Sequence, residues 1–374
     1  MTGSPSLAGG ARHLYVHLPF CVHRCGYCDF VTSVGRLDEH DRYVDALLSE
    51  LSRERPSLAP RLDTIFLGGG TPTFTEPHAL GRLLDGLPDA DEVTVEANPE
   101  TLTPALASLL RRNRVNRVSI GAQTFHPRLL EVLERTATPD DVKRSVHVLR
   151  EAGFDNLSLD LIYGIPGQST ADLEHDLAEA LALAPEHLSA YELEAKPGTR
   201  FTHAHGAELE RQGEAMESYI ELVVETLTGA GYRWYETANF CRADDARDLR
   251  AHHNLGYWRA RDYLGIGVGA VSTLGGSRRK NAPSVRGYMA AVEAGNRAPH
   301  DLEELSSEIR ESERVMLGLR LDEPLPLAEI GGAVDESEIA RLETAGLLVR
   351  DDGGLVLTAR GRFIGDAVTA AVLR

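Results

Sequence analysis

Short apolar runs alternate with amphipathic stretches along residues 12–240. The apolar runs, rich in Val, Ile, Leu and Tyr, are typical of buried strands: Tyr15–Leu18, Thr64–Leu67, Val93–Ala97, Arg117–Ile120, Leu157–Leu161, His187–Leu193 and Tyr232–Glu236. Between them, apolar residues recur with the helical period in Asp41–Arg53, Pro77–Gly86, Pro104–Asn113, Thr138–Ala152, Ala171–Leu183 and Glu214–Gly229. Repeated strand–helix units predict an α/β fold, with a parallel sheet wrapped by helices.

The pattern changes after residue 240. Residues 241–300 are less regular and are predicted to connect two domains; they contain the run His252-His253-Asn254-Leu255-Gly256-Tyr257-Trp258. Residues 301–374 show helix patterns flanking a hairpin, at Ser307–Gly318, Glu336–Thr344 and Arg360–Val372, with hairpin strands Leu347–Val349 and Leu355–Leu357. This arrangement predicts a small C-terminal α+β domain that is winged-helix-like. Residues 1–11 are expected to form a disordered N-terminus, which leaves residues 12–240 as the main domain.

The composition limits the classes of partner. The chain has 374 residues and a formal net charge of −18 at pH 7, and the predicted helix Glu336–Thr344 is itself net acidic. A nucleic-acid partner is therefore not expected, since phosphate contacts need basic surfaces. No apolar run approaches the roughly 20 residues of a membrane span. Clustered thiols without an export signal predict a cytoplasmic location.

Polar and glycine-rich motifs follow five consecutive predicted strands. They are the loop Cys21–Cys28, then Gly68-Gly69-Gly70-Thr71-Pro72-Thr73, Glu96-Ala97-Asn98-Pro99, Gly121-Ala122-Gln123 and the stretch from Asp160 to Gln168. The carboxyl ends of parallel strands meet at one edge of a sheet, where ligands bind. The motifs therefore predict one active site at that edge.

Three of the four cysteines, Cys21, Cys25 and Cys28, form a CxxxCxxC sequence on the first of these loops. Three thiolates can hold three irons of a 4Fe-4S cluster and leave the fourth iron open to a small molecule. A disulfide framework is disfavoured because cysteine is sparse. A zinc site that adds His23 is a weaker alternative, and a ferredoxin-type cluster would need a fourth cysteine nearby. We interpret the distant Cys241 as an ordinary buried thiol.

This cysteine loop, after the first strand of a β/α barrel and followed by a Gly-Gly motif, resembles the radical S-adenosylmethionine (SAM) superfamily. The resemblance implies a 4Fe-4S cluster whose open iron chelates SAM, which is cleaved reductively to a 5′-deoxyadenosyl radical. It also implies a reducing partner such as flavodoxin or ferredoxin. The glycines Gly68–Gly70 would let the backbone approach the methionine amino group, Tyr27 would pack on the adenine, and Glu96 would contact the ribose.

Further motifs are similar to those of the oxygen-independent coproporphyrinogen III oxidase family, which includes the HemW haem chaperones. They include Tyr15-Val-His-Leu-Pro-Phe-Cys21, Arg117-Val-Ser-Ile-Gly-Ala-Gln-Thr-Phe125 and a stretch ending in Gly198-Thr199. The resemblance covers nearly the whole chain and implies a partial (β/α)6 radical SAM barrel followed by the HemN C-terminal domain at residues 301–374. It further implies two SAM molecules, the first at Tyr15, Gly69, Glu96 and Val271, and the second at Tyr27, Gly70, Thr71, Gln123, Arg135 and Asp160.

Three branches of the family compete for this chain. The oxidase is disfavoured because Phe30 stands where it has a further cysteine. An aromatic residue there, together with His253-Asn254-Leu255-Gly256-Tyr257-Trp258, resembles HemW; His253 would then be associated with haem, beside Tyr257 and Trp258. HemW-like proteins, however, usually carry histidines where this chain has Ala137 and Val271.

Loss of two imidazoles from one cavity favours the third branch. We therefore hypothesise a class C radical SAM methyltransferase that acts on an sp² carbon of a heteroaromatic or peptide-derived natural product. A HemW-type haem chaperone that delivers haem to haemoproteins is the alternative, and an oxygen-independent coproporphyrinogen III oxidase ranks below both.

Overall fold

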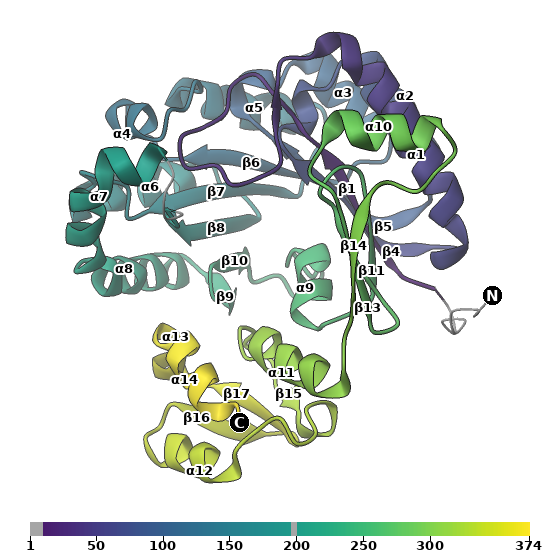
Figure 1. The fold of residues 1–374 in the computed structure, drawn as a ribbon. Coiled ribbons are helices and arrows are strands. Elements are labelled where there is room, and N and C mark those ends of the chain that lie inside the picture. Colours follow the sequence, from purple (N-terminus) through teal and green to yellow (C-terminus); the bar gives the residue numbers. More distant parts are fainter. Residues whose placement is uncertain (1–9, 196–199) are drawn as a thin grey trace.

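The computed structural model describes residues 10–195 and 200–374 (Figure 1). Most of the N-terminus predicted to be disordered, and the predicted motif position Gly198-Thr199, lie outside the described residues. Ala11 is an exception, because it is buried and pairs with Leu58 in an isolated β-bridge. The ordered chain therefore begins earlier than residue 12.

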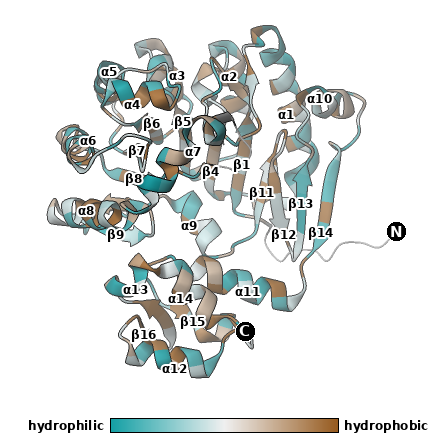
Figure 2. Ribbon diagram, turned by 60° about the vertical axis from the view of Figure 1, so that its left-hand side comes forward, coloured by the Kyte–Doolittle hydropathy of each residue, from teal (hydrophilic) through white to brown (hydrophobic). Residues whose placement is uncertain are grey.

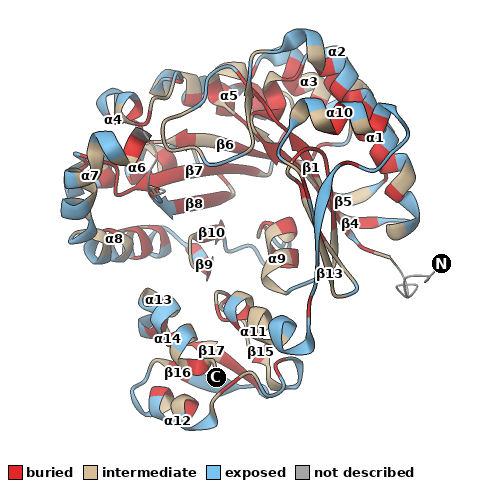
Figure 3. Cartoon of the chain, viewed as in Figure 1, coloured by how far each residue is buried: buried red, intermediate tan, exposed pale blue. Residues whose placement is uncertain are grey.

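Six parallel strands in chain order form the centre of the main sheet. They are β1 (His13–Leu18), β4 (Leu62–Gly69), β5 (Ala90–Ala97), β6 (Arg117–Gln123), β7 (Leu157–Tyr163) and β8 (His187–Glu192). Most of their residues are buried (Figure 3), as expected for strands that are covered on both faces. The predicted partial (β/α)6 barrel is confirmed.

Amphipathic helices cover the outside of this sheet. They are α1 (His40–Glu54), α2 (Pro77–Gly86), α3 (Pro104–Arg112), α5 (Pro139–Glu151), α6 (Thr170–Ala182) and α8 (Met216–Gly229). Helices α5 and α6 begin at capping boxes, in which the Thr138 and Ser169 hydroxyls accept from backbone N–H groups of the first turn. The short helices α4 (Pro127–Val132) and α7 (Arg200–Gly213) were not predicted.

The sheet extends beyond the barrel at both edges. On one side β11 (Tyr263–Ile266) runs parallel to β1, and β12 (Val271–Leu274), β13 (Ser277–Asn281) and β14 (His300–Glu304) follow antiparallel. On the other side β10 (Asn239–Arg242) and β9 (Tyr232–Glu236) add antiparallel strands.

The segment 241–300 is therefore largely part of this sheet, together with α9 (His252–Trp258) and α10 (Val285–Glu293). Sequence patterns missed this because strands such as β13, Ser-Arg-Arg-Lys-Asn, have no apolar alternation.

The C-terminal domain has a separate hydrophobic core formed by helices and a small sheet. Its elements are α11 (Ser307–Gly318), β15 (Leu325–Pro326), α12 (Glu336–Thr344), β16 (Leu348–Asp351), β17 (Gly354–Leu357), α13 (Ala359–Phe363) and α14 (Gly365–Val372). The hairpin β16–β17, whose first strand is labelled in Figure 2, turns at Asp352 and Gly353, which both have positive φ. The single helix predicted over Arg360–Val372 is broken at Ile364, whose ψ of 33° is not helical.

Within the described residues 10–195 and 200–374, no helix is long and apolar enough to cross a bilayer.

Candidate active site

The three clustered cysteines lie on the loop that follows β1. Cys21 ends the short strand β2 (Phe20–Cys21), which pairs with β3 (Ser33–Val34), and the N–H of Cys28 donates to the carbonyl of Cys25 at 3.2 Å. Cys21 is buried and the other two cysteines are partly exposed. Burial raises the pKa of the Cys21 thiol to about 11 and also raises the pKa of the Cys28 thiol. Burial therefore favours the neutral thiol at Cys21 and at Cys28.

A chain of hydrogen bonds joins two of these sulfurs through residues from other strand ends. The Thr71 hydroxyl donates to Cys21 Sγ at 3.5 Å, and an Arg135 N–H group donates to Cys25 Sγ at 3.7 Å. Asn98 links the two donors, because its Nδ2 donates to Thr71 Oγ1 at 3.0 Å and its Oδ1 accepts from Arg135 at 3.1 Å. The motifs after β4 and β5 thus converge on the cysteine loop.

The three consecutive glycines at the end of β4, Gly68 to Gly70, stand where side chains would collide. A Cβ on Gly69, whose φ is +113°, would lie 2.6 Å from the His17 ring. A Cβ on Gly70 would lie 2.6 Å from the Pro19 carbonyl group and 2.9 Å from Cys21 Sγ. The glycines therefore let the backbone pass close to the cysteine loop. Their approach to the methionine amino group of SAM stays a prediction.

A cavity of about 190 Å³ lies at this end of the barrel. Its lining includes Tyr15, Gly69, Glu96 and Asp160 from strands β1, β4, β5 and β7, together with Phe30, which is 63% exposed. The Tyr15 hydroxyl lies 3.0 Å from His17 Nδ1, and His17 Nε2 donates to the Val31 carbonyl at 2.9 Å. Since His17 Nε2 carries the proton, Tyr15 is the donor of the first hydrogen bond.

Two buried carboxyl groups face this cavity. Burial, with the nearby Asp160 charge as a second cause, raises the pKa of Glu96 to about 8. Burial also raises the pKa of Asp160, whose oxygens accept from the Ser119 hydroxyl at 3.0 and 3.2 Å. Glu96 accepts from the Gly69 N–H at 3.1 Å, which fixes it beside the glycine run. The cavity therefore offers acceptors for a polar ligand and one carboxyl group that is protonated near neutral pH.

Helix α9 brings the His253–Trp258 segment to the wall of the same cavity. Glu92, on β5, accepts the N–H groups of His252 and His253 at 3.2 Å each and so caps the start of the helix. His253, Asn254 and Tyr257 line the cavity, while Trp258 points into a different groove described below. The structure thus brings His253 and Tyr257 together with three of the four predicted first-SAM residues, Tyr15, Gly69 and Glu96.

Both ring nitrogens of His253 are already engaged. Its Nε2 lies 2.9 Å from the Tyr257 hydroxyl, and its Nδ1 lies 2.7 Å from Thr64 Oγ1. Thr64 Oγ1 is also 2.9 Å from His13 Nδ1, so its single proton goes to one imidazole while it accepts from the other. Burial lowers the pKa of His253 to about 3, which keeps the ring neutral.

Comparison with known proteins identifies the family of this site. Residues 15–180 match the Radical SAM superfamily, and residues 305–364 match the HemN C-terminal domain. The haem chaperone HemW of Mycobacterium tuberculosis is 36% identical over 388 residues, which cover 100% of this chain and 97% of the relative. The chain belongs to the HemN/HemW family of the radical SAM superfamily.

Two further members of the HemN/HemW family extend this result. The haem chaperone HemW of Bacillus subtilis is 34% identical over 380 residues, covering 97% of this chain and 99% of the relative. The crystal structure of coproporphyrinogen III oxidase (HemN) from Escherichia coli superposes with a TM-score of 0.81 at 24% identity, covering 98% of this chain and 91% of that one. At 24% identity, this superposition shows that the two chains share a fold.

The residues present fit the 4Fe-4S cluster and the SAM that the radical SAM superfamily implies. Three thiols occupy one loop, with Thr71 and Arg135 positioned to donate to sulfur. Among the described residues, no three Cys, His, Asp or Glu side chains converge on a point that could hold one metal ion, and His23 lies 3.8 Å from Glu134. A cluster needs no such convergence, because each of its irons takes a separate thiolate.

The residues predicted for a second SAM are divided between the cysteine loop and the cavity: Thr71 and Arg135 donate to cysteine sulfurs, whereas Asp160 lines the cavity. Arg135 and Asp160 do not pair with each other: Arg135 donates to Asn98, to Cys25 and, at 2.9 Å, to the Gly121 carbonyl. Its buried Nε has no hydrogen-bond partner. Gln123 has a positive φ of 65° beside a bulge in β6, and Tyr27 packs against a hydrophobic cluster that includes Phe201. A second SAM-sized ligand at these residues stays a prediction.

The two positions where histidines were expected do not line the 190 Å³ cavity. Ala137 is buried in the loop before α5, and Val271 lies on β12 against Lys280 of β13. The carbonyl of Val271 closely approaches Gly265, where a Cβ would lie 2.1 Å from it. The argument from two imidazoles lost from one cavity therefore finds no support in the fold.

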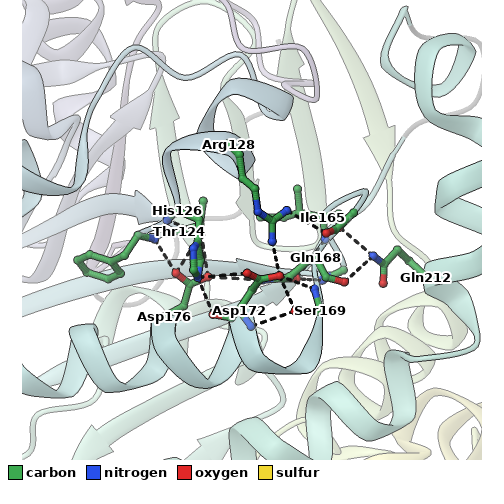
Figure 4. A network of polar contacts seen from close by, with 12 residues as sticks. Thr124, His126, Arg128, Ile165, Gln168, Ser169, Asp172, Asp176 and Gln212 are labelled. Atoms are coloured by element: carbon green, nitrogen blue, oxygen red, sulfur yellow. Dashed lines mark hydrogen bonds and ion pairs between the residues drawn. The ribbon is translucent and has the colours of Figure 1, made fainter.

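The stretch from Gly164 to Gln168, predicted as part of the ligand edge, has a structural role in this family member (Figure 4). Gln168 Oε1 accepts from the Gly164 N–H at 2.8 Å, and the buried Asp176 of α6 accepts from the Thr124 hydroxyl at 2.8 Å and from the Phe125 N–H at 2.6 Å. The network ties the loops after β6 and β7 to helix α6. It therefore fixes the strand ends that carry Gln123 and Asp160.

Sequence reasoning missed several residues that shape the site. Asn98 links the donors to two sulfurs, His17 orients Tyr15, Thr64 bonds His253, and Glu92 caps α9. Asn98 could have been identified from the sequence, since it belongs to the Glu-Ala-Asn-Pro motif after the third predicted strand. The other three lie inside strands, where alternation alone does not separate a packing residue from a positioning one.

Proposed function

We propose that this protein is a haem chaperone of the HemW type that also holds a 4Fe-4S cluster and SAM. The observation that carries the proposal is the match to HemW proteins named as haem chaperones at 34–36% identity over essentially the full chain. This match includes the cysteine loop, α9 and the C-terminal domain. Phe30, which lines the cavity and stands where the oxidase has a further cysteine, favours this branch over the oxidase.

The methyltransferase hypothesis from the sequence is not supported. The full-length relatives are named haem chaperones, and the two substituted histidine positions do not line the cavity. Because the lost imidazoles were the reason to favour a new substrate, that preference no longer has a structural basis. The second SAM molecule, on which the methyl transfer depended, remains a separate prediction.

The chain's own residues define what the site does. When bound, the cluster supplies an electron for the reductive cleavage of SAM. Thr71 and Arg135 donate to two sulfurs, and the glycine run lets the backbone pass close to Cys21. Glu96 and Asp160 would offer acceptor oxygens to a ligand in the cavity. His253 is held neutral between Thr64 and Tyr257, so ligation of a haem iron at its Nε2 would require breaking the Tyr257 hydrogen bond.

Haem titration of the full-length protein with its cluster reconstituted tests the proposal. We expect a Soret band that saturates at a single equivalent of haem per chain. A linear rise in absorbance without an endpoint, as for non-specific association, would remove the basis for the chaperone function.

A second assay separates the chaperone from the methyltransferase. Reduced, reconstituted protein is incubated with SAM that carries a deuterated methyl group and with heteroaromatic or peptide acceptors. We expect no deuterated acceptor and no stoichiometric S-adenosylhomocysteine. A deuterated product would restore the methyltransferase hypothesis.

A further inference from the structure

A groove of about 1000 Å³ lies between helix α9 and helix α11, at the junction of the barrel with the C-terminal domain. The two helices pack beside each other (Figure 1). The turn between β12 and β13, at Gly275 and Gly276, forms another wall. The volume lies at the upper end of the range of about 300–1,000 Å³ that small-molecule sites occupy. It is much larger than the 190 Å³ cavity inside the barrel.

The lining of the groove is rich in aromatic and aliphatic surface. Tyr257 and Trp258 come from α9, Tyr263 from β11, and Met316 and Leu317 from α11. Met316 is 53% exposed, although a methionine in a folded domain is usually buried. Its thioether is therefore accessible from the groove, and a thioether is a soft ligand for haem iron.

The groove also contains cationic groups without a carboxylate partner. Among the described residues, neither Arg261 nor Arg310 forms an ion pair, and both line the groove. By contrast Arg278 and Arg314, on the same lining, pair with Glu313 and Glu329. Two free guanidinium groups beside an apolar surface complement a flat, apolar ligand that carries two carboxylates.

We propose that this groove is the haem site, with Met316 as a ligand to the iron and Arg261 and Arg310 as partners of the two propionates. The inference rests on the proposed chaperone function and says where the haem is held. It departs from the expectation that His253 is the haem-associated residue, because both ring nitrogens of His253 are already bonded inside the protein.

Tyr257 connects this groove with the barrel. It lines both the groove and the 190 Å³ cavity, and its hydroxyl bonds His253 Nε2 at 2.9 Å. Tyr257 therefore forms part of the wall between the groove and the 190 Å³ cavity. The segment His253–Trp258 shapes the groove through Tyr257 and Trp258.

Haem titrations of matched variants of the full-length protein test the site. Met316→Leu keeps the side-chain volume and removes the sulfur; its control is Met216→Leu, since Met216 lies beside Gly164, away from the groove. The double variant Arg261→Gln, Arg310→Gln removes the free charges; its control is Arg286→Gln, at an exposed arginine of α10.

We expect Met316→Leu to abolish the absorption and magnetic circular dichroism signature of thioether ligation and to raise the Kd for haem about tenfold, equivalent to 1.4 kcal/mol. The double arginine variant should raise the Kd by a similar factor and weaken its dependence on salt. Both control variants should bind haem as the unmodified protein does.

Three outcomes would overturn the assignment of the groove as the haem site. In the first, the unmodified protein binds haem stoichiometrically and both groove variants keep its affinity and spectrum. In the second, a folded His253→Ala variant alone loses the iron-ligand signature. Either of these leaves the chaperone function standing. In the third, the unmodified protein binds no haem, and the chaperone function fails with the site.

Discussion

His253 illustrates how single residues at this site are constrained. The sequence singles it out as a haem-associated residue, yet the structure places it 1% exposed, with Thr64 and Tyr257 on its two nitrogens. A histidine in this setting positions its neighbours. The same reasoning applies to Asn98 and Thr71, whose side chains act on the cysteine loop rather than on a ligand directly.

A first prediction concerns the hydrogen bond from Thr71 to Cys21 Sγ. Hydrogen bonds to cluster sulfurs stabilise the reduced, more negative state. Thr71→Val should therefore make the midpoint potential of the reconstituted cluster more negative, by on the order of tens of mV. A redox titration followed by electron paramagnetic resonance measures the shift. The matched control is Thr73→Val, because the buried Thr73 hydroxyl bonds Thr101 instead of a sulfur; equal shifts in the two variants would contradict the assignment.

A second prediction concerns Glu96, whose pKa in the folded protein is raised to about 8 by burial. The unfolded chain releases this proton near pH 4.5, so between these values the folded state binds more protons. The free energy of unfolding should consequently fall as the pH rises from 4.5 to 8, by up to about 1.4 kcal/mol per pH unit. Glu96→Gln removes this titration and keeps an acceptor for the Gly69 N–H.

Urea unfolding of the cluster-free protein and of Glu96→Gln across that pH range gives the comparison. The difference between the two stabilities should change with pH in the stated direction. A constant difference would mean that Glu96 ionises at its ordinary pKa in the fold.

At the level of elements, the strand–helix alternation was sufficient to predict the barrel. The helices Pro77–Gly86, Ser307–Gly318 and Glu336–Thr344 occur with the predicted bounds, because each presents one apolar face and starts at a proline or a capping residue. The order of motifs along the sheet predicted which residues approach the cysteine loop, since parallel strands place their carboxyl ends at one edge.

The parts of the fold and the site that the sequence did not predict depend on tertiary contacts, which local sequence patterns do not reveal. Strands β13 and β14 are polar and short, and they extend the sheet edge that β11 and β12 provide. Arg135 and Asp160, both predicted for the second SAM, do not contact each other, because Asn98 and the Gly121 carbonyl accept from the guanidinium instead. The tertiary structure decides which of several polar groups a buried side chain bonds.

A third prediction concerns the network that ties α6 to the strand ends. Asp176 accepts hydrogen bonds from the Thr124 hydroxyl and from the Phe125 N–H, and it is buried. Asp176→Ala leaves both donors without a partner, so the free energy of unfolding should fall by about 3 kcal/mol. Urea denaturation measures the change.

The control for Asp176 is Asp140→Asn on the surface of α5, for which a change within about 0.5 kcal/mol is expected. If Asp176→Ala were as stable as Asp140→Asn, the network would not be what fixes these loops.

On the scale of the whole molecule, the C-terminal domain docks on the barrel through polar contacts. Arg320 pairs with the fully buried Glu236 at 2.7 Å, and its guanidinium lies 4.5 Å from the centroid of the Trp258 ring. Arg233 pairs with Asp322 at 2.7 Å, and Arg259 pairs with Glu323 at the same distance. These contacts hold α11 next to α9, so the groove between the helices depends on them.

A fourth prediction follows for this interface. Arg320→Ala removes the cationic partner of a buried carboxylate, so it should destabilise the docked state by about 2 kcal/mol and increase hydrogen exchange in α11. Arg350→Ala serves as the control, since Arg350 pairs with Glu336 on the exposed surface of the same domain. Equal protection of α11 in the two variants would mean that other contacts maintain the docking.

The central claim is that the chain hands haem to another protein, and stopped-flow transfer to an apo-haemoprotein tests it most directly. Haem-loaded, full-length protein is mixed with increasing concentrations of the acceptor, and the acceptor's absorption spectrum is followed. The account predicts that the transfer rate rises with the acceptor concentration, because the two proteins must meet. A rate that does not depend on the acceptor, as for haem lost passively to solution, or complete retention of haem by the chain, would contradict it.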